Sequence, residues 1–204
     1  MFCCQNKKNK YKFLFILPFV VIFALGGFWY LKSATFYPTY EIGQEIDSFN
    51  GIPVYFNGGV GNVSGRNLSS DGYNYGLKWQ CVEYTKRFLY DHLNHKMPNS
   101  YGHAKDFFNP NVEDGEINAD RGLYQYTNSS SSKPKVNDLL IFDKTQFNPY
   151  GHVAIISKVT DDEIEIIQQN AGIHAPTRET FSLIKEGNKW KIEHSKVLGW
   201  LRKK

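Results

Sequence analysis

A change of hydrophobic period along the chain constrains the fold more than any other feature. The run from Cys81, CVEYTKRFLYDHLNH, places Val82, Leu89 and Leu93 near one stripe, which predicts an amphipathic helix of about fifteen residues. From Asp138 on, short β-branched segments alternate with turn residues. They predict strands at Asp138–Asp143, His152–Ser157, Glu163–Gln169, Lys189–Ile192 and Val197–Leu201. A helix followed by an antiparallel sheet is an α+β layout.

The N-terminal part of the chain contains a long apolar segment without a charge, Phe13–Leu31. Its length is close to the roughly 20 residues that span a hydrocarbon core. Lysines precede the segment and Phe28-Trp29-Tyr30 ends it, so the positive-inside rule and the aromatic belt place the N-terminus in the cytoplasm. We expect a cytoplasmic basic tail (1–12), a single transmembrane anchor or uncleaved signal (13–31), a tether (32–42) and one extracytoplasmic domain (43–204), periplasmic or at the cell surface.

Two other interpretations of this segment stay open. One is a cleaved signal peptide, although Ala24-Leu25-Gly26-Gly27 offers no A-x-A cleavage site. The other is a buried core helix, which the length and the lysine flanks disfavour.

The charge balance argues against a nucleic-acid partner. The formal net charge is +4, but no Asp or Glu precedes Glu41, and five of the 24 Lys and Arg residues lie in or beside the apolar segment (Lys7, Lys8, Lys10, Lys12 and Lys32). The rest of the chain is therefore near neutral and lacks the clustered Lys and Arg that bind a phosphate backbone. We expect a monomer whose membrane contact is the N-terminal helix.

The cysteines indicate one thiol available for chemistry. Cys3 and Cys4 precede the apolar segment, so Cys81 is alone in the domain and cannot form a disulfide within it. It is either an idle buried residue or a nucleophile. A nucleophilic thiolate needs a pKa below the usual value of about 8.5, and both a helix N-terminus and a neighbouring imidazolium lower it. The unpaired N–H groups of that helix start would also stabilise an oxyanion.

His152 is the base that we expect to serve Cys81. It opens a predicted strand, which places its ring at a sheet end. If Thr160-Asp161-Asp162 forms the turn, one even register sets His152 opposite Gln168 and the next sets it opposite Asn170, whereas the odd register between them turns both amides away. In either even register a side-chain amide can orient the imidazole. The other histidines lack partners at metal-ligand spacing, so no metal or cofactor is expected.

Four motifs together resemble a known family. They are Gly76–Tyr84 (GLKWQCVEY), Asp138–Asp143 (DLLIFD), Gly151–Ile156 (GHVAII) and Gln168–Asn170 (QQN). Their order and spacing resemble the CHAP family, the cysteine, histidine-dependent amidohydrolases/peptidases, from about Gly43 to Leu201. The amidase domain of glutathionylspermidine synthetase/amidase is especially similar, since Asn170, His174, Pro176 and Arg178 also look alike.

The resemblance implies a papain-like CHAP fold, in which a helix bearing the catalytic Cys packs on an antiparallel sheet. It implies Cys81 as nucleophile and His152 as base, with Gln168 or Asn170 as the orienting residue. Relatives have Glu where this chain has Gln168, and a neutral amide lacks the charge that stabilises imidazolium. The residues expected to bind substrate are Tyr75, Trp79, Gln80 and Arg178.

The family acts on amide bonds, and location selects among the substrates. CHAP domains cut peptidoglycan, either between its peptide residues or at the muramoyl-alanine amide, and the amidase branch cuts glutathionylspermidine. A domain outside the membrane meets cell-wall peptide, so we expect a peptidoglycan hydrolase. Two alternatives remain: hydrolysis of a peptide-polyamine conjugate, and a wall-binding module that has lost turnover.

Overall fold

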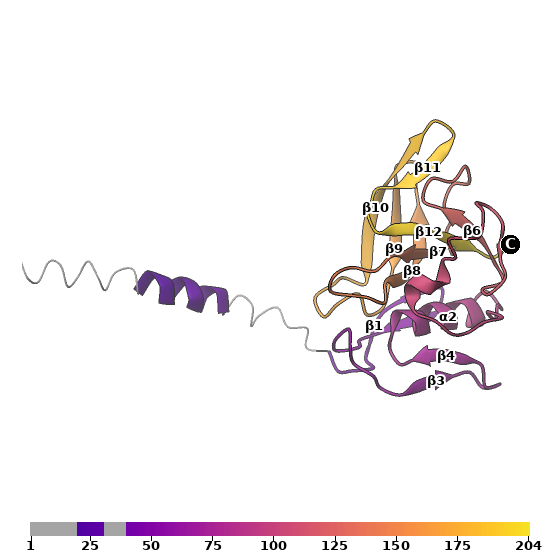
Figure 1. Cartoon of the computed structure of the whole chain (residues 1–204). Coiled ribbons are helices and arrows are strands. Elements are labelled where there is room, and N and C mark those ends of the chain that lie inside the picture. Colours follow the sequence, from indigo (N-terminus) through magenta and orange to yellow (C-terminus); the bar gives the residue numbers. More distant parts are fainter. Residues whose placement is uncertain (1–19, 31–39) are drawn as a thin grey trace, which may run out of the picture. The chain divides into compact units, whose positions relative to one another are not determined.

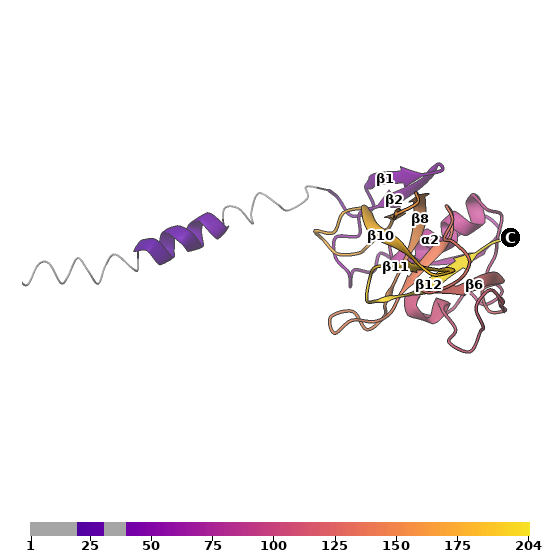
Figure 2. The same cartoon turned by 90° about the horizontal axis from the view of Figure 1, so that it is seen from above.

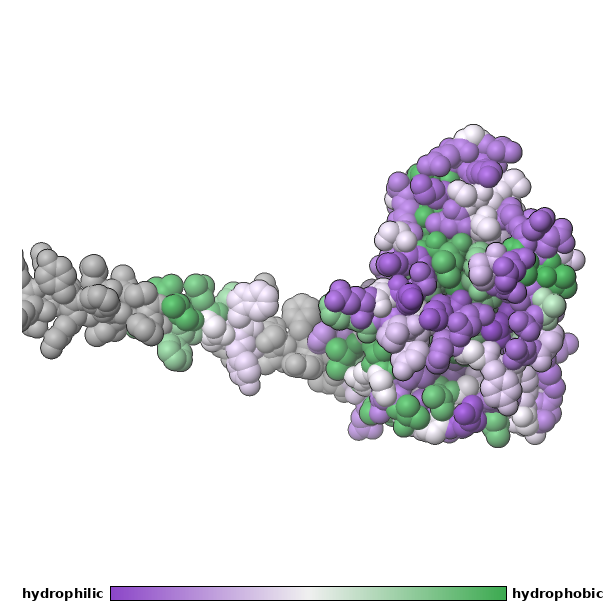
Figure 3. Space-filling model, in the orientation of Figure 1, coloured by the Kyte–Doolittle hydropathy of each residue, from purple (hydrophilic) through white to green (hydrophobic). Residues whose placement is uncertain are grey.

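The computed structural model describes residues 20–30 and 40–204, which belong to two separate compact units. Residues 20–30 are helical, and their large apolar side chains, such as Phe23 and Trp29, are exposed (Figure 3). Within the described ranges, no helix is both long enough and apolar enough to cross a membrane. The predicted anchor, 13–31, extends beyond the described residues at both ends, so it stays a prediction.

The second unit, Tyr40–Lys204, is built on an eight-stranded antiparallel sheet (Figures 1 and 2). Its spatial order is β11-β10-β9-β8-β7-β12-β6-β5. The strands in chain order are β5 (Ile117–Asn118), β6 (Leu123–Thr127), β7 (Leu139–Phe142), β8 (His152–Val159), β9 (Glu163–Ile167), β10 (Arg178–Glu186), β11 (Lys189–Ile192) and β12 (Val197–Arg202). The five predicted strands correspond to β7, β8, β9, β11 and β12, whereas β10 and the β5–β6 pair were not predicted.

The single α-helix of this unit, α2 (Cys81–Asp91), is shorter than the predicted fifteen residues. It ends at the cap residue His92, and Asn94 adopts a left-handed φ of 50°, which a continuing helix does not allow. Two small hairpins flank the helix: β1 (Glu45–Phe49) with β2 (Ile52–Tyr55), and β3 (Arg66–Leu68) with β4 (Asn74–Leu77). The helix contacts β8 of the large sheet, β2 and β4, so α2 separates the sheet from the β3–β4 hairpin (Figure 1).

The sheet has an apolar core on each face because neighbouring strand residues point to opposite sides. Leu139 and Ile141 of β7 pack in the cluster that contains Phe88 of α2 and Phe107 of the 3-10 helix Ala104–Phe107. Leu140 and Phe142 pack in a second cluster with Trp200 of β12. Burial on both faces explains why β7 reads as an unbroken apolar run, and the α+β prediction is confirmed.

A buried ion pair joins the last strand to the turn before β7. The Arg202 Nε and Nη2 atoms donate to both carboxylate oxygens of Asp138, at 2.8 and 2.7 Å, and the two side chains are 10% and 2% exposed. Arg202 also donates to Ser132 Oγ and to the Lys133 carbonyl. The pair therefore ties the C-terminal end of β12 to the start of β7, its neighbour in the sheet.

Replacing Arg202 by Met should lower the free energy of unfolding by about 3–5 kcal/mol, since the substitution leaves the Asp138 carboxylate buried and unpaired. The matched control is Lys191→Met, whose ion pair with Glu186 is exposed and should contribute less than about 1 kcal/mol. Urea denaturation of both variants measures the difference. Equal losses in the two variants would contradict the assigned role of the Arg202–Asp138 pair.

Candidate active site

Cys81 and His152 line the same cavity, which has a volume of about 440 Å³. Cys81 is the first residue of α2, and His152 is the first residue of β8. The packing of α2 on β8 brings these two element starts together. The other walls come from residues 60–63, the β3–β4 hairpin, residues 100–104 and the segment that leads into β8.

The surroundings of the Cys81 thiol act in opposite directions on its ionisation. Burial raises the pKa of Cys81 to about 11, although hydrogen bonds from the backbone N–H groups of Val153, Val82 and Cys81 favour the thiolate. The expectation of a lowered pKa was therefore wrong. The N–H groups of the helix start are present, but desolvation outweighs them.

His152 is shifted in the direction that keeps its imidazole neutral. Burial lowers the pKa of His152 to about 4, and the hydrogen bond that its ring donates to Gln168 only partly opposes this shift. The expected imidazolium is therefore absent near pH 7, which removes one of the two causes predicted to lower the thiol pKa. The resting pair consists of a thiol and a neutral imidazole.

Gln168 determines which imidazole nitrogen carries the proton. Its Nε2 donates to the Pro176 carbonyl at 3.1 Å and to Glu179 Oε2 at 3.4 Å. Its Oε1 therefore faces His152 Nε2, at 2.9 Å, and must accept a hydrogen bond from an N–H at that nitrogen. A neutral imidazole that carries its proton on Nε2 has an unprotonated Nδ1 available as a base.

A β-bulge brings Gln168 to the face of His152. Next to the turn, Val159 pairs with Ile164, and in that register Gln168 would lie on the opposite face. One extra residue, Ser157, shifts the pairing so that Ile155 opposes Ile167, and Ala154 then shares a face with Gln168. Near His152 the strands therefore pair in one of the even registers, in which an amide shares the face of the imidazole, as the orienting role required. The turn spans the predicted residues 160–162.

Asn170 does not contact the imidazole but lines another part of the cavity. It leaves the strand with φ 59°, and its Nδ2 donates to Gln80 Oε1 at 2.6 Å and to the Val60 carbonyl at 3.2 Å. Gln80 Nε2 in turn donates to the Asn62 carbonyl at 2.8 Å. Gln80 therefore lies in the cavity wall, as expected of a substrate-binding residue, and the two amides hold residues 60–62 there.

The other three residues expected to bind substrate do not line this cavity. Tyr75 is buried and donates its hydroxyl to Asp91. Trp79 packs on the ring of Tyr55, with 4.2 Å between the centroids. Arg178 pairs with Asp47 and Glu165, each at 3.0 Å. Their expected place in the cleft is corrected, because each side chain is engaged by protein groups elsewhere.

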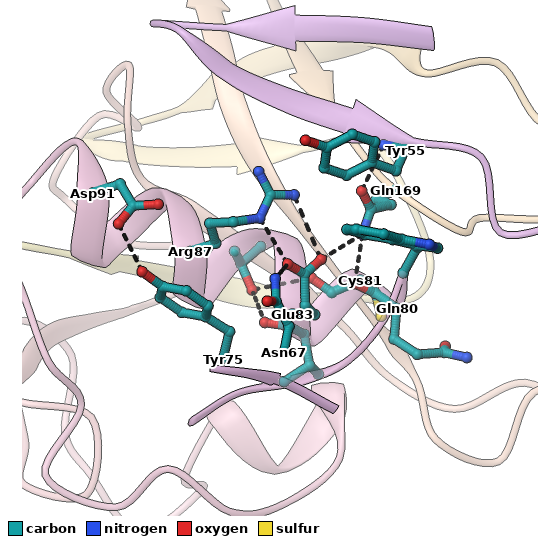
Figure 4. A network of polar contacts seen from close by, with 12 residues as sticks. Tyr55, Asn67, Tyr75, Gln80, Cys81, Glu83, Arg87, Asp91 and Gln169 are labelled. Carbon is teal, nitrogen blue, oxygen red and sulfur yellow. Dashed lines mark hydrogen bonds and ion pairs between the residues drawn. The ribbon is translucent and has the colours of Figure 1, made fainter. Parts of the chain in front are cut away.

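A buried carboxylate that sequence reasoning missed supports the helix start (Figure 4). Glu83 accepts hydrogen bonds from Asn67 Nδ2 at 2.7 Å, Gln169 Nε2 at 2.8 Å and Arg87 Nε at 2.6 Å. Gln169 also donates to the carbonyl of Gln80, the residue before Cys81. The spacing of Glu83 and Arg87 by four residues on a helix was the available signal.

The structure also places charged and aromatic residues in the cavity that were not predicted there. Arg66, Tyr101, His103 and Tyr150 all line it. Across the described ranges, no group of three or more His, Cys, Asp or Glu is arranged to hold a metal ion.

Comparison with curated proteins finds relatives whose names include a synthetase, and in one case also an amidase. The bifunctional glutathionylspermidine synthetase/amidase of Escherichia coli is 33% identical over 139 residues, which covers 62% of this chain and 22% of that protein. Trypanothione synthetase of Crithidia fasciculata is 30% identical over 123 residues, 60% of this chain and 19% of that protein. The chain thus spans about a fifth of the length of these relatives.

Solved structures give weaker likenesses. Ly7917 with the hydrolyzing product of MDP is 29% identical with a TM-score of 0.27, covering 36% of this chain and 30% of that one. Ly7917 alone is 19% identical with a TM-score of 0.37, covering 60% and 52%. Scores this low support no argument about fold or function.

Comparison with models of protein families gives a match between residues 71–170 and the CHAP domain. That range contains Cys81, His152 and Gln168, whose geometry is described above. The part of the chain that holds the candidate site therefore matches the CHAP domain family.

Proposed function

We propose that this protein is a cysteine amidohydrolase in which Cys81 is the nucleophile and His152 the general base and acid. The observation that carries the proposal is the shared cavity of Cys81 and His152. Gln168 supports it, because its fixed amide leaves Nδ1 of His152 unprotonated. The similarity to proteins whose names include an amidase supports the reaction class.

The reaction follows from a pair that starts neutral. Nδ1 of His152 accepts the thiol proton as the Cys81 sulfur attacks the amide carbonyl, and the N–H groups of the helix start stabilise the oxyanion. The imidazolium then donates that proton to the leaving amine as the C–N bond breaks, which leaves a thioester. Water attacks the thioester, gives a proton to His152, and releases the acid as the thiol re-forms.

For the substrate, we propose an amide bond in peptidoglycan. The predicted anchor supports this substrate, because it would hold the domain outside the cytoplasm, where cell-wall peptide is the available amide. The exposed apolar side chains of residues 20–30 favour contact with an apolar phase. The second candidate is a peptide-polyamine conjugate such as glutathionylspermidine, which the similarity to the synthetase/amidase favours.

A third candidate, a wall-binding module without turnover, is favoured by one observation. The pKa of Cys81 is raised to about 11, so the resting thiol is protonated. Loss of hydrolysis on removal of the sulfur separates this candidate from the enzyme.

Replacing Cys81 by Ala should reduce amide hydrolysis by at least about a thousandfold, since the nucleophile is removed. Full-length protein is incubated with peptidoglycan and, separately, with glutathionylspermidine, and product masses identify the bond cleaved. A Cys3→Ala, Cys4→Ala double variant is the control and should retain the wild-type rate. Hydrolysis that survives in Cys81→Ala, or that is absent from wild type on both substrates, rules out the proposed enzyme.

The pH dependence should report the half-buried imidazole of His152. Below about pH 4 His152 takes up a second proton at Nδ1 and can no longer accept one from the thiol, so kcat/KM should fall through that pH and not near the ordinary value of about 6.5. Gln168→Glu should shift this acidic limb to higher pH, because a carboxylate beside Nε2 stabilises imidazolium.

The control for this pH experiment is Asn188→Asp, which makes the same amide-to-carboxylate change at the exposed β10–β11 turn. It should leave the acidic limb where it is in wild type. An unchanged limb in Gln168→Glu would contradict the assigned role of Gln168.

The proposed anchor can be tested by fractionation. Introducing lysine at both Val21 and Phe23 should move the protein out of carbonate-washed membranes, since each lysine near the centre of a span costs about 2.5–3.5 kcal/mol on insertion scales. Ser33→Lys, beyond the apolar run, is the control and should remain with the membrane. Retention of the double variant would exclude a spanning helix.

A further inference from the structure

The cavity that contains Cys81 and His152 has charge of one sign. Among the described residues that line it, the charged side chain is Arg66, histidines aside, and no Asp or Glu is present. The uncharged part of the wall includes the exposed aromatic residues Tyr101 and Tyr150. A ligand in this cavity therefore meets a cation and no carboxylate.

Arg66 has no partner of opposite charge in the described part of the chain. It lies on β3 with an exposed side chain, and its one hydrogen bond runs from Nη1 to Asn74 Oδ1 at 3.4 Å. The other arginines of the domain are engaged: Arg87 with Glu83, Arg178 with Asp47 and Glu165, Arg202 with Asp138, and Arg121 with backbone carbonyls. Most of the Arg66 guanidinium is thus available to a ligand.

Two buried cations lie behind the same wall. Lys86 Nζ donates to the carbonyls of Asn74 and Ser100, two residues that line the cavity. Arg121 donates to the carbonyls of Asn99 and Tyr101 at 2.8 and 2.9 Å. Burial, followed by the charges of Arg121 and Arg66, lowers the pKa of Lys86 to about 8, in keeping with the position of Lys86 near both guanidinium groups.

The nearby acidic residues offset the charge of Arg121 but not those of Lys86 and Arg66. The carboxylates of Asp106 and Asp120 interact electrostatically with Arg121. Asp106 also accepts a hydrogen bond from the backbone N–H of His103. Asp71 is paired with Lys96 at 2.6 Å. Lys86 and Arg66 are left with carbonyl and amide oxygens as partners, so the potential in this part of the cavity is positive.

We propose that Arg66 binds a free carboxylate on the part of the substrate that enters the cavity, which rests on the amidohydrolase function proposed above. The substrate class is then an amide whose cavity-bound part is a peptide acid. A polyamine would meet Arg66 as a like charge, so the polyamine end of a conjugate would lie outside this cavity.

The test compares two matched substrates. Muropeptides released from peptidoglycan are used as they are and after conversion of their carboxylates to carboxamides, and kcat/KM is measured for full-length protein. Wild type should prefer the acid form by about tenfold, mainly through KM, as expected for a charge-assisted hydrogen bond that is partly open to solvent. Arg66→Gln should lose that preference and hydrolyse both forms at the rate of the amidated one.

The control is Lys189→Gln, which removes one positive charge from an exposed position on β11 and should keep the preference. If both forms are hydrolysed without preference by wild type, or if Arg66→Gln retains the preference, the Arg66 subsite is overturned while the amidohydrolase stands. If neither form is hydrolysed, the enzyme proposal fails and both forms serve as stable ligands. Their dissociation constants then decide: about tenfold tighter binding of the acid form to wild type supports the subsite, and equal binding overturns it.

Discussion

The buried carboxylate of Glu83 is the contact on which the site geometry depends. It joins three separate parts of the chain, because its hydrogen-bond donors come from β3, from the end of β9 and from the next turn of α2. A buried charge is tolerated only with such partners, and it in turn fixes their positions. The start of α2, and with it Cys81, is therefore held against the strand end that carries Gln169 (Figure 4).

The adjacent residues Gln168 and Gln169 point to opposite faces of the sheet and bond to different parts of the site. Gln168 bonds to His152, whereas Gln169 bonds to Glu83 and to the Gln80 carbonyl at the helix start. One strand end thus aligns the imidazole and the helix that bears the thiol. The neutral resting state of the pair is consistent with this arrangement, since an amide orients the ring without supplying the charge that would stabilise imidazolium.

Much of this fold and part of the site were predictable from the sequence. The β-branched runs predicted β7, β8 and β9, and the parity of a hairpin predicted that an amide would reach His152. The strand β10 was missed because its residues, Arg178–Glu186, are mostly exposed and lack a clear alternation. The direction of the Cys81 pKa was missed because desolvation depends on packing around the sulfur, which no sequence period reports. Tyr75 and Trp79 were placed in the cleft because they are aromatic and shortly precede Cys81, and Arg178 by family likeness. Their partners Asp91, Tyr55 and Asp47 come from elsewhere in the chain.

The bulge at Ser157 lets β8 be one residue longer than the stretch of β9 that it pairs with. Deleting Ser157 would join Ile156, which opposes Ile166, directly to Lys158, which opposes Glu165, so the ladder would become regular and Ile155 would still oppose Ile167. Gln168 would then stay on the same face of the sheet as His152. A single-codon deletion here would remove the local twist of the bulge and preserve the partners of the imidazole, whereas a deletion in the paired part of β8 would turn its side chains to the other face.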